Sequence, residues 1–479
     1  MNIKLVLRVL AFLSIFLGIG MLLPLPFSYY YNSGDATALM KSAAVCFSIG
    51  LLVFIPKDIS KNFKTKDGFA IVTFGWIIMA LLGSLPYLFS GAIPNFTNAI
   101  FETMSGFTTT GSTILTDIEA LPKGILFWRS ITHWLGGMGI IVLTIAILPF
   151  LGIAGMQLFK AESSGPFSDK LKPRITHTAK LLWTVYLVLT ITELLMLMSG
   201  GMGFYDSINH AFATLATGGF STYNSSIVGQ SSYIQYVLIA FMVLAGTNFS
   251  LHYYFVTGNF TTYFRSPEFR FYFFSILIAS FLIFFNIYTQ YNGALELAFR
   301  DSLFQVVSCV TCTGFASADY ELWGTTPQLL LLLLMMGGGM AGSTAGGIKT
   351  VRLILLLKFT YNQFVKVLHP KAVVPLRIGS RYVDEKTVLD VLGFFMLYIV
   401  ILATSVLLLT VFGLDLISSI GAVVTAMSGV GPGLNLVGPM DNFSFLPDVS
   451  KWLLSFLMLA GRLELLTVII LLSPNYWHK

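Results

Sequence analysis

The segment Phe107-Thr108-Thr109-Thr110-Gly111-Ser112 occurs three more times along the chain in altered form, and this repetition is the strongest indication of the fold. The other copies are Leu215-Ala216-Thr217-Gly218-Gly219-Phe220, Thr311-Cys312-Thr313-Gly314-Phe315-Ala316 and Ser428-Gly429-Val430-Gly431-Pro432. The matching glycines are 107, 96 and 117 residues apart, at Gly111, Gly218, Gly314 and Gly431. Each copy follows a short helix-like stretch and lies between two long apolar runs. The pattern predicts one membrane module that is repeated four times.

The composition is that of a helical membrane protein. Of the 479 residues, 56% are hydrophobic and 10% are charged, with a mean hydropathy of +0.80. Soluble proteins carry about 25% charged residues. The apolar runs are long enough to cross a hydrocarbon layer of about 30 Å. The first run, 9–23, has no small-residue cleavage site, so we interpret it as a helix and not as a signal peptide.

The basic residues predict the topology. The net charge is +6, and most Lys and Arg residues fall on one side of the membrane if the spans alternate. These residues lie in 4–8, 57–66, 160–180, 265–270 and 349–386, and at Lys479. Because cytoplasmic loops are enriched in basic residues, we expect these segments and both termini in the cytoplasm. This topology accounts for the charge better than a nucleic-acid-binding patch does.

We expect an all-α integral membrane fold with ten spans. A two-helix hairpin occupies 1–66, and four pore repeats follow at 67–156, 157–257, 258–358 and 359–479. Each repeat has an outer helix, a pore helix, a filter loop and an inner helix around one central pore. The hairpin helices are expected at 9–31 and 38–56. The repeat elements are expected at 68–90, 97–108, 108–112 and 124–151; at 178–199, 205–216, 216–220 and 231–256; at 271–288, 300–311, 311–315 and 327–357; and at 387–411, 415–427, 428–432 and 450–472.

The four pore helices are too short to span the membrane, since about 12 residues at 1.5 Å each reach about 18 Å. We expect Asp206, Asp301 and Asp415 at the starts of three of them, where an acidic side chain suits the exposed N–H groups, and Thr97 at the start of the first. The carboxyl ends then point to a common axis. Irregular backbone at membrane depth is tolerated only inside protein or beside water, so the pattern predicts a central aqueous path.

The four loops are candidate ion-binding segments. Main-chain carbonyls can replace the water shell of a dehydrated cation without binding it too tightly to leave, and glycine lets successive carbonyls turn to the axis. Each glycine alone is better explained as an ordinary helix–loop junction, but four in register favour the ring. The predicted ion-binding residues, which would hold potassium, are Thr109, Thr110, Gly111, Ala216, Thr217, Gly218, Cys312, Thr313, Gly314, Gly429, Val430 and Gly431.

The third inner helix contains a glycine-rich stretch, Gly337-Gly338-Gly339-Met340-Ala341-Gly342-Ser343-Thr344-Ala345-Gly346-Gly347-Ile348-Lys349. Each glycine costs a helix about 1 kcal/mol relative to alanine, so the helix should break here. One interpretation is close helix packing through small residues. The other is a flexible gate below the carbonyl ring, which the polar residues of the stretch favour. The predicted gate residues are Gly337, Gly338, Gly339, Gly342, Ser343, Thr344, Gly346, Gly347 and Lys349, with Arg462 added below.

Arg462 lies deep in the last span, where a charge needs a cavity or a partner. Two interpretations stay open: a structural pair with Glu464 or another carboxylate, or a fixed positive charge that raises the barrier to cations. Arg129, near the outer end of the first inner helix, has Glu102 as a candidate partner, which favours a structural role.

The sequence offers little for an enzyme. Cys46, Cys309 and Cys312 give no disulfide framework, and a lone C-x-x-C pair is a weak redox or zinc signal. The histidines form no H-E-x-x-H pattern, and there is no P-loop or dinucleotide-binding motif. We expect His210, in the second pore helix, to be a hydrogen-bonded core residue.

Over essentially its whole length the chain resembles the TrkH branch of the Trk/Ktr/HKT superfamily of potassium transporters. The resemblance is carried by the four filter-like segments, by Gly337–Lys349, by Gly461-Arg462-Leu463-Glu464 and by the closing Leu471-Leu472-Ser473-Pro474-Asn475-Tyr476-Trp477. It implies filter glycines at Gly111, Gly218, Gly314 and Gly431, a gate loop over 337–347, and a pore-facing arginine at Arg462. In plant relatives a serine at the first filter glycine goes with sodium permeation, so Gly111 favours potassium.

The resemblance also implies partners. The family works as a homodimer with one pore per subunit, in the lipid bilayer of the bacterial inner membrane. A cytosolic ring of nucleotide-binding TrkA subunits controls the gate, and the segments 158–180, 257–270 and 358–386 are candidate docking surfaces. We expect no cofactor on this chain and potassium as its substrate. Val430 and Pro432 depart from the family pattern, as does Cys312, so the four loops need not be equivalent.

The sequence therefore predicts a bacterial inner-membrane potassium uptake protein that is not an enzyme. A carbonyl-lined selectivity filter would admit the ion, and an intramembrane loop and a cytosolic regulatory ring would gate it. The alternative is a secondary transporter coupled to protons or sodium by alternating access. This alternative is less favoured, because the sequence has few buried carboxylates that could serve as a proton relay.

Overall fold

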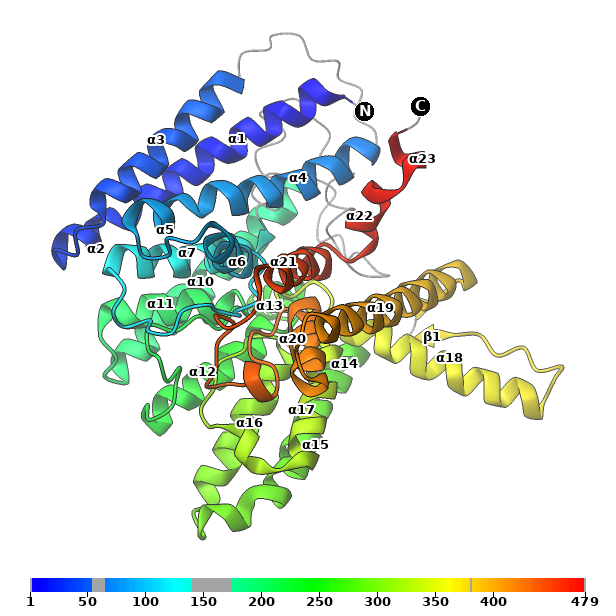
Figure 1. Ribbon diagram of the computed structural model, residues 1–479. Coiled ribbons are helices and arrows are strands. Elements are labelled where there is room, and N and C mark those ends of the chain that lie inside the picture. Colours follow the sequence, from blue (N-terminus) through cyan, green and yellow to red (C-terminus); the bar gives the residue numbers. More distant parts are fainter. Residues whose placement is uncertain (1, 54–64, 140–174, 260, 380, 478–479) are drawn as a thin grey trace.

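The computed structural model describes residues 2–53, 65–139, 175–259, 261–379 and 381–477. These residues are mostly helical, as predicted for an all-α membrane fold. Within them the only strands are the two-residue pair β1 (Arg377–Ile378) and β2 (Arg381–Tyr382), which pair antiparallel after α18 (Thr350–Leu368). Helix α18 and the chain directly after it project from the helical body (Figure 1), whereas β1 returns to the base of α18, where Ile378 packs in one cluster with Val351 and Leu355.

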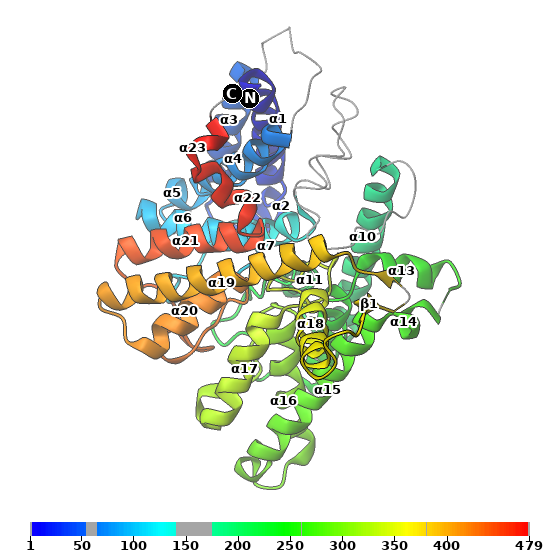
Figure 2. The same ribbon diagram turned by 90° about the vertical axis from the view of Figure 1, so that its right-hand side faces the viewer.

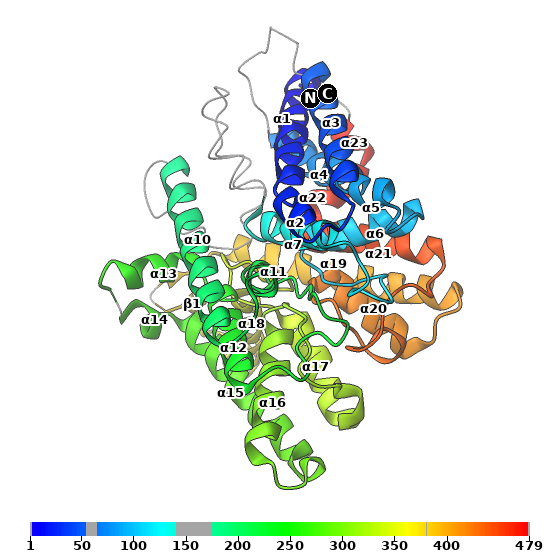
Figure 3. The same cartoon turned by 90° about the vertical axis from the view of Figure 1, so that its left-hand side faces the viewer.

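The N-terminal hairpin consists of α1 (Ile3–Leu22), the short α2 (Leu25–Tyr30) and α3 (Ala36–Val53). Helix α1 packs along α3 and also along the first outer helix, α4 (Thr65–Gly83). Figures 2 and 3 show α23 (Pro474–Trp477) near α4, where the Asn2 amide donates to an Asp67 oxygen at 2.7 Å and the Lys66 ammonium donates to the Tyr476 carbonyl at 3.1 Å. The hairpin is joined to the first inner helix by Asp35, whose carboxylate accepts a hydrogen bond from the Ile125 amide at 2.6 Å.

The four modules follow in order. The first has α4, α5 (Leu85–Ser90), α6 (Phe96–Phe107) and α7 (Lys123–Gly137). The second has α10 (Ile175–Ser199), α11 (Phe204–Leu215), α12 (Ser232–Ala245) and α13 (Phe249–Val256). The third has α14 (Thr261–Arg265), α15 (Pro267–Ile287), α16 (Leu295–Val310), α17 (Thr325–Gly337) and α18. The fourth has α19 (Glu385–Val411), α20 (Leu416–Ser428), α21 (Asp448–Arg462), α22 (Leu466–Ile469) and α23 (Pro474–Trp477). Short 3₁₀ turns lie at Tyr288–Tyr291, Tyr320–Trp323, Asn435–Val437 and Ile470–Leu472.

The predicted spans correspond to long apolar helices. Among the described residues, six helices are long and apolar enough to cross a membrane, or eight if two bent pairs each count as one span. Of the two remaining predicted spans, 327–357 is interrupted after α17. The other, 124–151, is described only as far as residue 139, so its second half lies outside the described residues.

Two inner helices differ from the prediction because they are not continuous. The second bends by 101° between α12 and α13, and the fourth bends by 112° between α21 and α22. At the first bend, Asn248 caps α13 by accepting a hydrogen bond from the Ser250 amide at 2.8 Å. At the second, Glu464 and Leu465 have positive φ values of 59° and 35°.

The starts of the pore helices are partly as predicted. Asp415 caps α20 through the Ser418 amide at 3.0 Å, which confirms that prediction. Asp206 lies in the first turn of α11 and does not cap it. The predictions for the other two helices are wrong: Asn95 caps α6, and α16 begins at Leu295, before Asp301. In both cases the helix begins earlier than the apolar pattern indicates.

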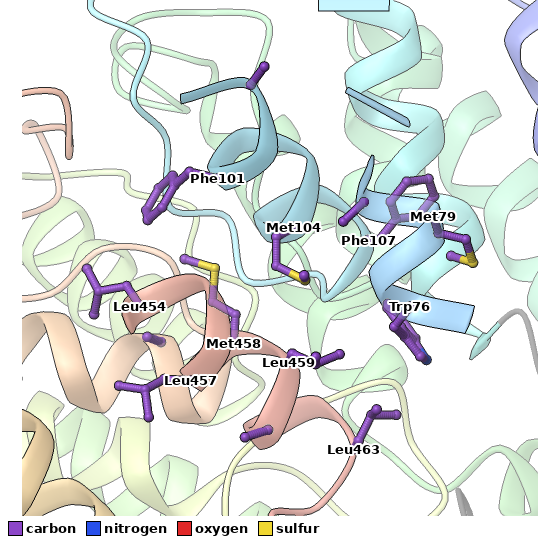
Figure 4. Close-up of a cluster of buried hydrophobic side chains, with 14 of the residues drawn as sticks. Trp76, Met79, Phe101, Met104, Phe107, Leu454, Leu457, Met458, Leu459 and Leu463 are labelled. Carbon is purple, nitrogen blue, oxygen red and sulfur yellow. The ribbon is translucent and has the colours of Figure 1, made fainter. Parts of the chain in front are cut away.

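The hydrophobic core joins the last module to the first. Figure 4 shows apolar side chains of α6 between those of α4 and α21; the labelled residues are Trp76, Met79, Phe101, Met104, Phe107, Leu454, Leu457, Met458, Leu459 and Leu463. A second cluster holds the second and third modules together. Because the fourth module packs on the first, the four modules close into a ring and their loops meet at its centre.

Candidate functional site

The four filter loops (108–112, 216–220, 311–315 and 428–432) share one backbone conformation. In each, the second residue has a positive φ: 53° at Thr109, 53° at Thr217, 57° at Cys312 and 70° at Gly429. The amide of the next residue then bonds to the carbonyl five residues earlier, inside the pore helix. These bonds are Thr110 to Ser105 at 2.9 Å, Gly218 to Ala213 at 2.8 Å, Thr313 to Ser308 at 2.8 Å and Val430 to Thr425 at 3.1 Å. The sequence-level repeat is therefore also a structural repeat.

The shared conformation corrects one alignment made from the sequence. The next position in each loop is a glycine with a positive φ, at Gly111, Gly219, Gly314 and Gly431. In the second loop the equivalent of Gly111 is thus Gly219, whereas Gly218 corresponds to Thr110, Thr313 and Val430. The Thr-Gly pattern selected Gly218 because two adjacent glycines cannot be told apart by sequence alone.

The four glycines close a ring around one axis. A Cβ on Gly111 would overlap the carbonyl oxygen of Gly218. In the same way, a Cβ on Gly219 would overlap the Thr313 oxygen and one on Gly314 the Val430 oxygen. On Gly431 it would lie 2.9 Å from the Thr110 oxygen, closer than real Cβ contacts allow. The contacts run from loop one to two, three, four and back to one. Glycine is required here both by the positive φ and by this close approach of neighbouring backbones.

Paired threonine hydroxyls lie within two of the four filter loops. The side chains of Thr108 and Thr110 lie 2.8 Å apart, and those of Thr311 and Thr313 lie 2.7 Å apart. Ala216 and Ser428 hold the corresponding positions in the other two loops, so loops one and three match each other best. The hydroxyl pairs therefore distinguish loops one and three from loops two and four.

Arg129 and Glu102 form the contact that the sequence suggested. The guanidinium Nε lies 2.7 Å from a Glu102 oxygen, and both side chains are buried. The same guanidinium donates to the Ser221 carbonyl at 3.1 Å and lies 3.4 Å from the centre of the Phe220 ring. Glu102 also accepts from the Ile114 amide at 3.0 Å. The pair thus fastens the first pore helix to the segments that follow the first and second filter loops, which is a structural role.

The histidines and cysteines near the ring also play supporting parts. His210 contacts the Asp206 carbonyl at 2.7 Å and the Ser221 hydroxyl at 3.0 Å, as expected of a satisfied core residue. His133 stacks on Phe220 with ring centres 3.9 Å apart. Cys309 and Cys312 are buried free thiols. Within the described ranges, no group of three or more His, Cys, Asp or Glu residues is arranged to hold a metal ion.

The glycine-rich stretch, called the gate segment below (Gly337–Lys349), is an irregular loop between α17 and α18, as predicted. Positive φ values occur at Gly338, Gly342, Gly347 and Lys349. The segment passes directly below the fourth filter loop, because a Cβ on Gly346 would overlap the Ser428 carbonyl oxygen. Its backbone therefore contacts the inner end of the ring.

The gate segment is held by the break in the second inner helix. The Met340 amide donates to the Gly246 carbonyl at 2.9 Å, and the Thr344 hydroxyl donates to the Ala245 carbonyl at 3.1 Å. In return the Phe249 amide donates to the Gly342 carbonyl at 3.0 Å. Backbone groups that are left unpaired where the second inner helix breaks thus form hydrogen bonds with those of the gate segment, where the third inner helix breaks.

Arg462, at the end of α21, holds the segment from the opposite side. Its guanidinium donates to the Thr344 carbonyl at 2.8 Å and to the carbonyls of Gly136 and Gly137 at 2.7 and 2.9 Å. Of the interpretations left open for Arg462, a pair with Glu464 is not what the structure has, because Glu464 pairs with Arg352, with Oε2 2.6 Å from the guanidinium. Arg462 therefore places a positive charge next to the gate segment while joining the first and fourth inner helices to it.

Sequence reasoning missed Gly219, Arg352 and Asn248, whose side-chain nitrogen would lie 2.9 Å from a Cβ on Gly342 of the gate segment. Arg352 follows the gate segment by three residues, and a charge so close to a predicted break within a span is a signal that could have identified it. Asn248 lies in Gly246-Thr247-Asn248, a helix-capping pattern inside an apolar run.

The chain was compared with known proteins. A family model described as "TrkH: Cation transport protein" matches residues 36–479. The "Trk system potassium uptake protein TrkH" of Escherichia coli K12 is 38% identical, with all of both chains covered. The "Trk system potassium uptake protein TrkI" of Halomonas elongata is 35% identical over 99% of this chain and 97% of its own. The crystal structure of "the Potassium Transporter TrkH from Vibrio parahaemolyticus" superposes with a TM-score of 0.90 at 34% identity, over all of both chains. This chain belongs to the TrkH family of cation transport proteins, a family of multi-pass membrane transporters and not of enzymes.

Proposed function

We propose that this protein takes up potassium across the bacterial inner membrane through the ring of four filter loops. The relatives named as potassium uptake proteins cover the whole chain, which supports potassium as the substrate. The single observation that carries the mechanism is the cyclic approach of the four glycines to neighbouring carbonyls, from Gly111 around to Gly431.

In the ring, backbone oxygens of the filter loops would replace the water shell of the ion. Neutral carbonyls suit this task, because the ion must bind and then leave. The ion-binding residues are those predicted from the sequence, with Gly219 joining Gly218 in the second loop. The membrane potential would drive inward flow, at about 2.3 kcal/mol per charge for each 100 mV.

The gate segment and Arg462 would control passage below the ring. The gate residues are Gly337, Gly338, Gly339, Gly342, Ser343, Thr344, Gly346, Gly347 and Lys349 together with Arg462. Their position against the inner end of the fourth filter loop supports this role. The alternative, packing by small residues, is less suited to a stretch whose polar Thr344 and Lys349 are buried.

The working unit would be a homodimer in the inner membrane with one pore per subunit and both termini in the cytoplasm. Cytosolic TrkA-type nucleotide-binding subunits would dock on 158–180, 257–270 and 358–386, of which much of 158–180 lies outside the described residues. We also propose the hairpin and repeat boundaries given above as its domain organisation. Potassium is the substrate, and no bound cofactor is needed for the proposed mechanism.

The test is ion-replacement flux in liposomes that contain only this polypeptide. We expect flux that follows the potassium gradient without a proton or sodium gradient. Gly111→Ser should raise sodium permeation relative to potassium, because the added side chain meets the Gly218 carbonyl. Gly91→Ser is the matched control, since Gly91 has a φ of 72° and nothing within 4 Å of a built Cβ. Equal permeability ratios in the two variants would contradict the filter assignment.

Proton-coupled transport is the second candidate, and one residue favours it. Glu193 of α10 is fully buried beside Thr214 of the second pore helix, and it has no salt bridge within the described residues. If coupling operates, an inward proton gradient should accelerate potassium uptake, and Glu193→Gln should abolish that acceleration. Uptake that does not depend on the proton gradient would contradict proton coupling and favour the channel-like mechanism.

A further inference from the structure

The break in the fourth inner helix carries two opposite charges that hold different parts of the gate region. Arg462 donates to the Thr344 carbonyl in the middle of the gate segment at 2.8 Å. Glu464, two residues later, pairs with Arg352 in the first turn of α18, directly after the gate segment. The pair has two contacts, at 3.2 Å and 2.6 Å. One short break therefore holds the gate segment at its middle and at its exit.

Arg352 is fixed on three sides. Besides the carboxylate of Glu464, its guanidinium donates to the Ile348 carbonyl at 3.3 Å and lies 4.2 Å from the centre of the Phe394 ring on α19. Only 7% of Arg352 is exposed. A planar guanidinium held by a two-contact carboxylate and an aromatic face is specific in geometry as well as charge. Its position therefore sets that of the first turn of α18.

The backbone that presents Glu464 is strained. Glu464 and Leu465 have φ values of 59° and 35°, which residues with a side chain rarely adopt. Such conformations persist only where the surroundings impose them. Contacts at the bend include the ion pair and the hydrogen bond from the Leu465 amide to the Ala460 carbonyl at 2.7 Å. Losing the pair would remove the side-chain contact of Glu464 to α18.

We propose that Arg352 and Glu464 form a latch that keeps the gate segment closed below the filter loops. The proposal rests on the gating role proposed above. Helix α18 runs from the gate segment outward, away from the helical body (Figure 1). A displacement of α18 must therefore either separate the pair or pull the break of the fourth inner helix with it. Separation releases the exit of the gate segment and loosens the residues that position Arg462.

The first test is potassium flux in liposomes with charge-neutralised variants. Glu464→Gln and Arg352→Gln should each raise basal flux by about tenfold, since breaking a largely buried pair leaves one charge uncompensated in the closed state. The exchanged pair, Arg352→Glu with Glu464→Arg, should return flux toward that of the parent. Glu296→Gln is the control, because it removes an exposed carboxylate from an ion pair outside the gate, in which the Glu296 and Arg300 atoms lie 2.8 Å apart.

The second test does not depend on transport. Hydrogen exchange of the Ile348 and Thr350 amides, bonded to Met336 and Gly339 carbonyls at 3.0 Å, reports whether the exit of the gate segment opens. Exchange at both should accelerate in Glu464→Gln and recover in the exchanged pair. If the parent carries no potassium, the proposed function fails while exchange still decides the latch. If Glu464→Gln folds poorly, Arg352→Lys, which keeps the charge but not the two-contact geometry, takes its place. Parent-like flux and parent-like exchange in the single variants would overturn the latch.

Discussion

The third and fourth inner helices are both broken where they meet, at the contact between Arg462 and Thr344, but for different reasons. The third is broken by glycine: the gate segment has three glycines with positive φ that most other residues would avoid. The fourth is broken at Leu463-Glu464-Leu465, residues with no local reason to leave a helix. There the bend is held by contacts with other parts of the chain. A helix can thus be broken by glycines, which adopt positive φ values easily, or by contacts that residues at the break make with other parts of the chain.

The two breaks are complementary. The glycine-encoded loop offers carbonyls that need donors, and the break in the fourth helix supplies Arg462 and Glu464, which hold the loop directly and through Arg352. Since the second inner helix also pairs its free groups with the gate segment, three broken helices and the end of α7 meet below the ring. This convergence gives the segment defined positions despite its glycines.

The largest effect should come from shortening the glycine-encoded break. Deleting residues 340–346 removes the loop below the ring, and we expect basal potassium flux to rise about tenfold or more, as for a shift of at least 1.4 kcal/mol toward the open state. The measurement is liposome flux with a parallel check of folding. A folded deletion variant that leaks no more than the parent would assign the segment to packing.

A smaller rise should follow from removing the partner charge. Arg462→Ala loses the bonds to Thr344, Gly136 and Gly137 together with the positive charge, so flux should increase several fold. Arg462→Lys is the informative companion, because it keeps the charge but cannot bond all three carbonyls in the same geometry. Normal flux with a lower melting temperature in Arg462→Ala would give the residue a purely structural role.

Measurements of stability should show how tightly the glycine-encoded break is packed. Gly338→Ala should lower the free energy of unfolding by about 1–2 kcal/mol or more, because it combines a positive φ with a collision against the Gly346 carbonyl. Gly324→Ala has a φ of 88° and open space around it, so it measures the backbone term alone. Equal losses in the two variants would show that the gate segment is not tightly packed.

The smallest effect is expected at the second break. Asn248→Ala removes the side-chain cap of α13 and should cost about 1 kcal/mol of stability, seen as a modest fall in melting temperature. Potassium flux should change little if the Phe249–Gly342 backbone bond holds the segment by itself. A change in flux as large as that of Arg462→Ala would show that this break shares in gating.

Much of the fold could be predicted because it depends on local patterns. Apolar runs mark the outer helices, short helix-like stretches mark the pore helices, and the glycines of 337–347 mark the third break. The break in the fourth inner helix could not be predicted, because the contact between Arg352 and Glu464 joins residues far apart in the chain. The docking of Asp35 on Ile125 was hidden for the same reason. In the filter, the sequence indicated all four loops but could not decide between Gly218 and Gly219.

The central claim is that backbone oxygens of four loops form one ion site on the axis of the ring. The most direct measurement is anomalous scattering from crystals of this protein grown with rubidium or thallium in place of potassium. We expect a peak enclosed by the segments around Gly111, Gly219, Gly314 and Gly431, and its loss when sodium is the only cation. Ordered ions found elsewhere, with the ring filled by packed side chains, would contradict it.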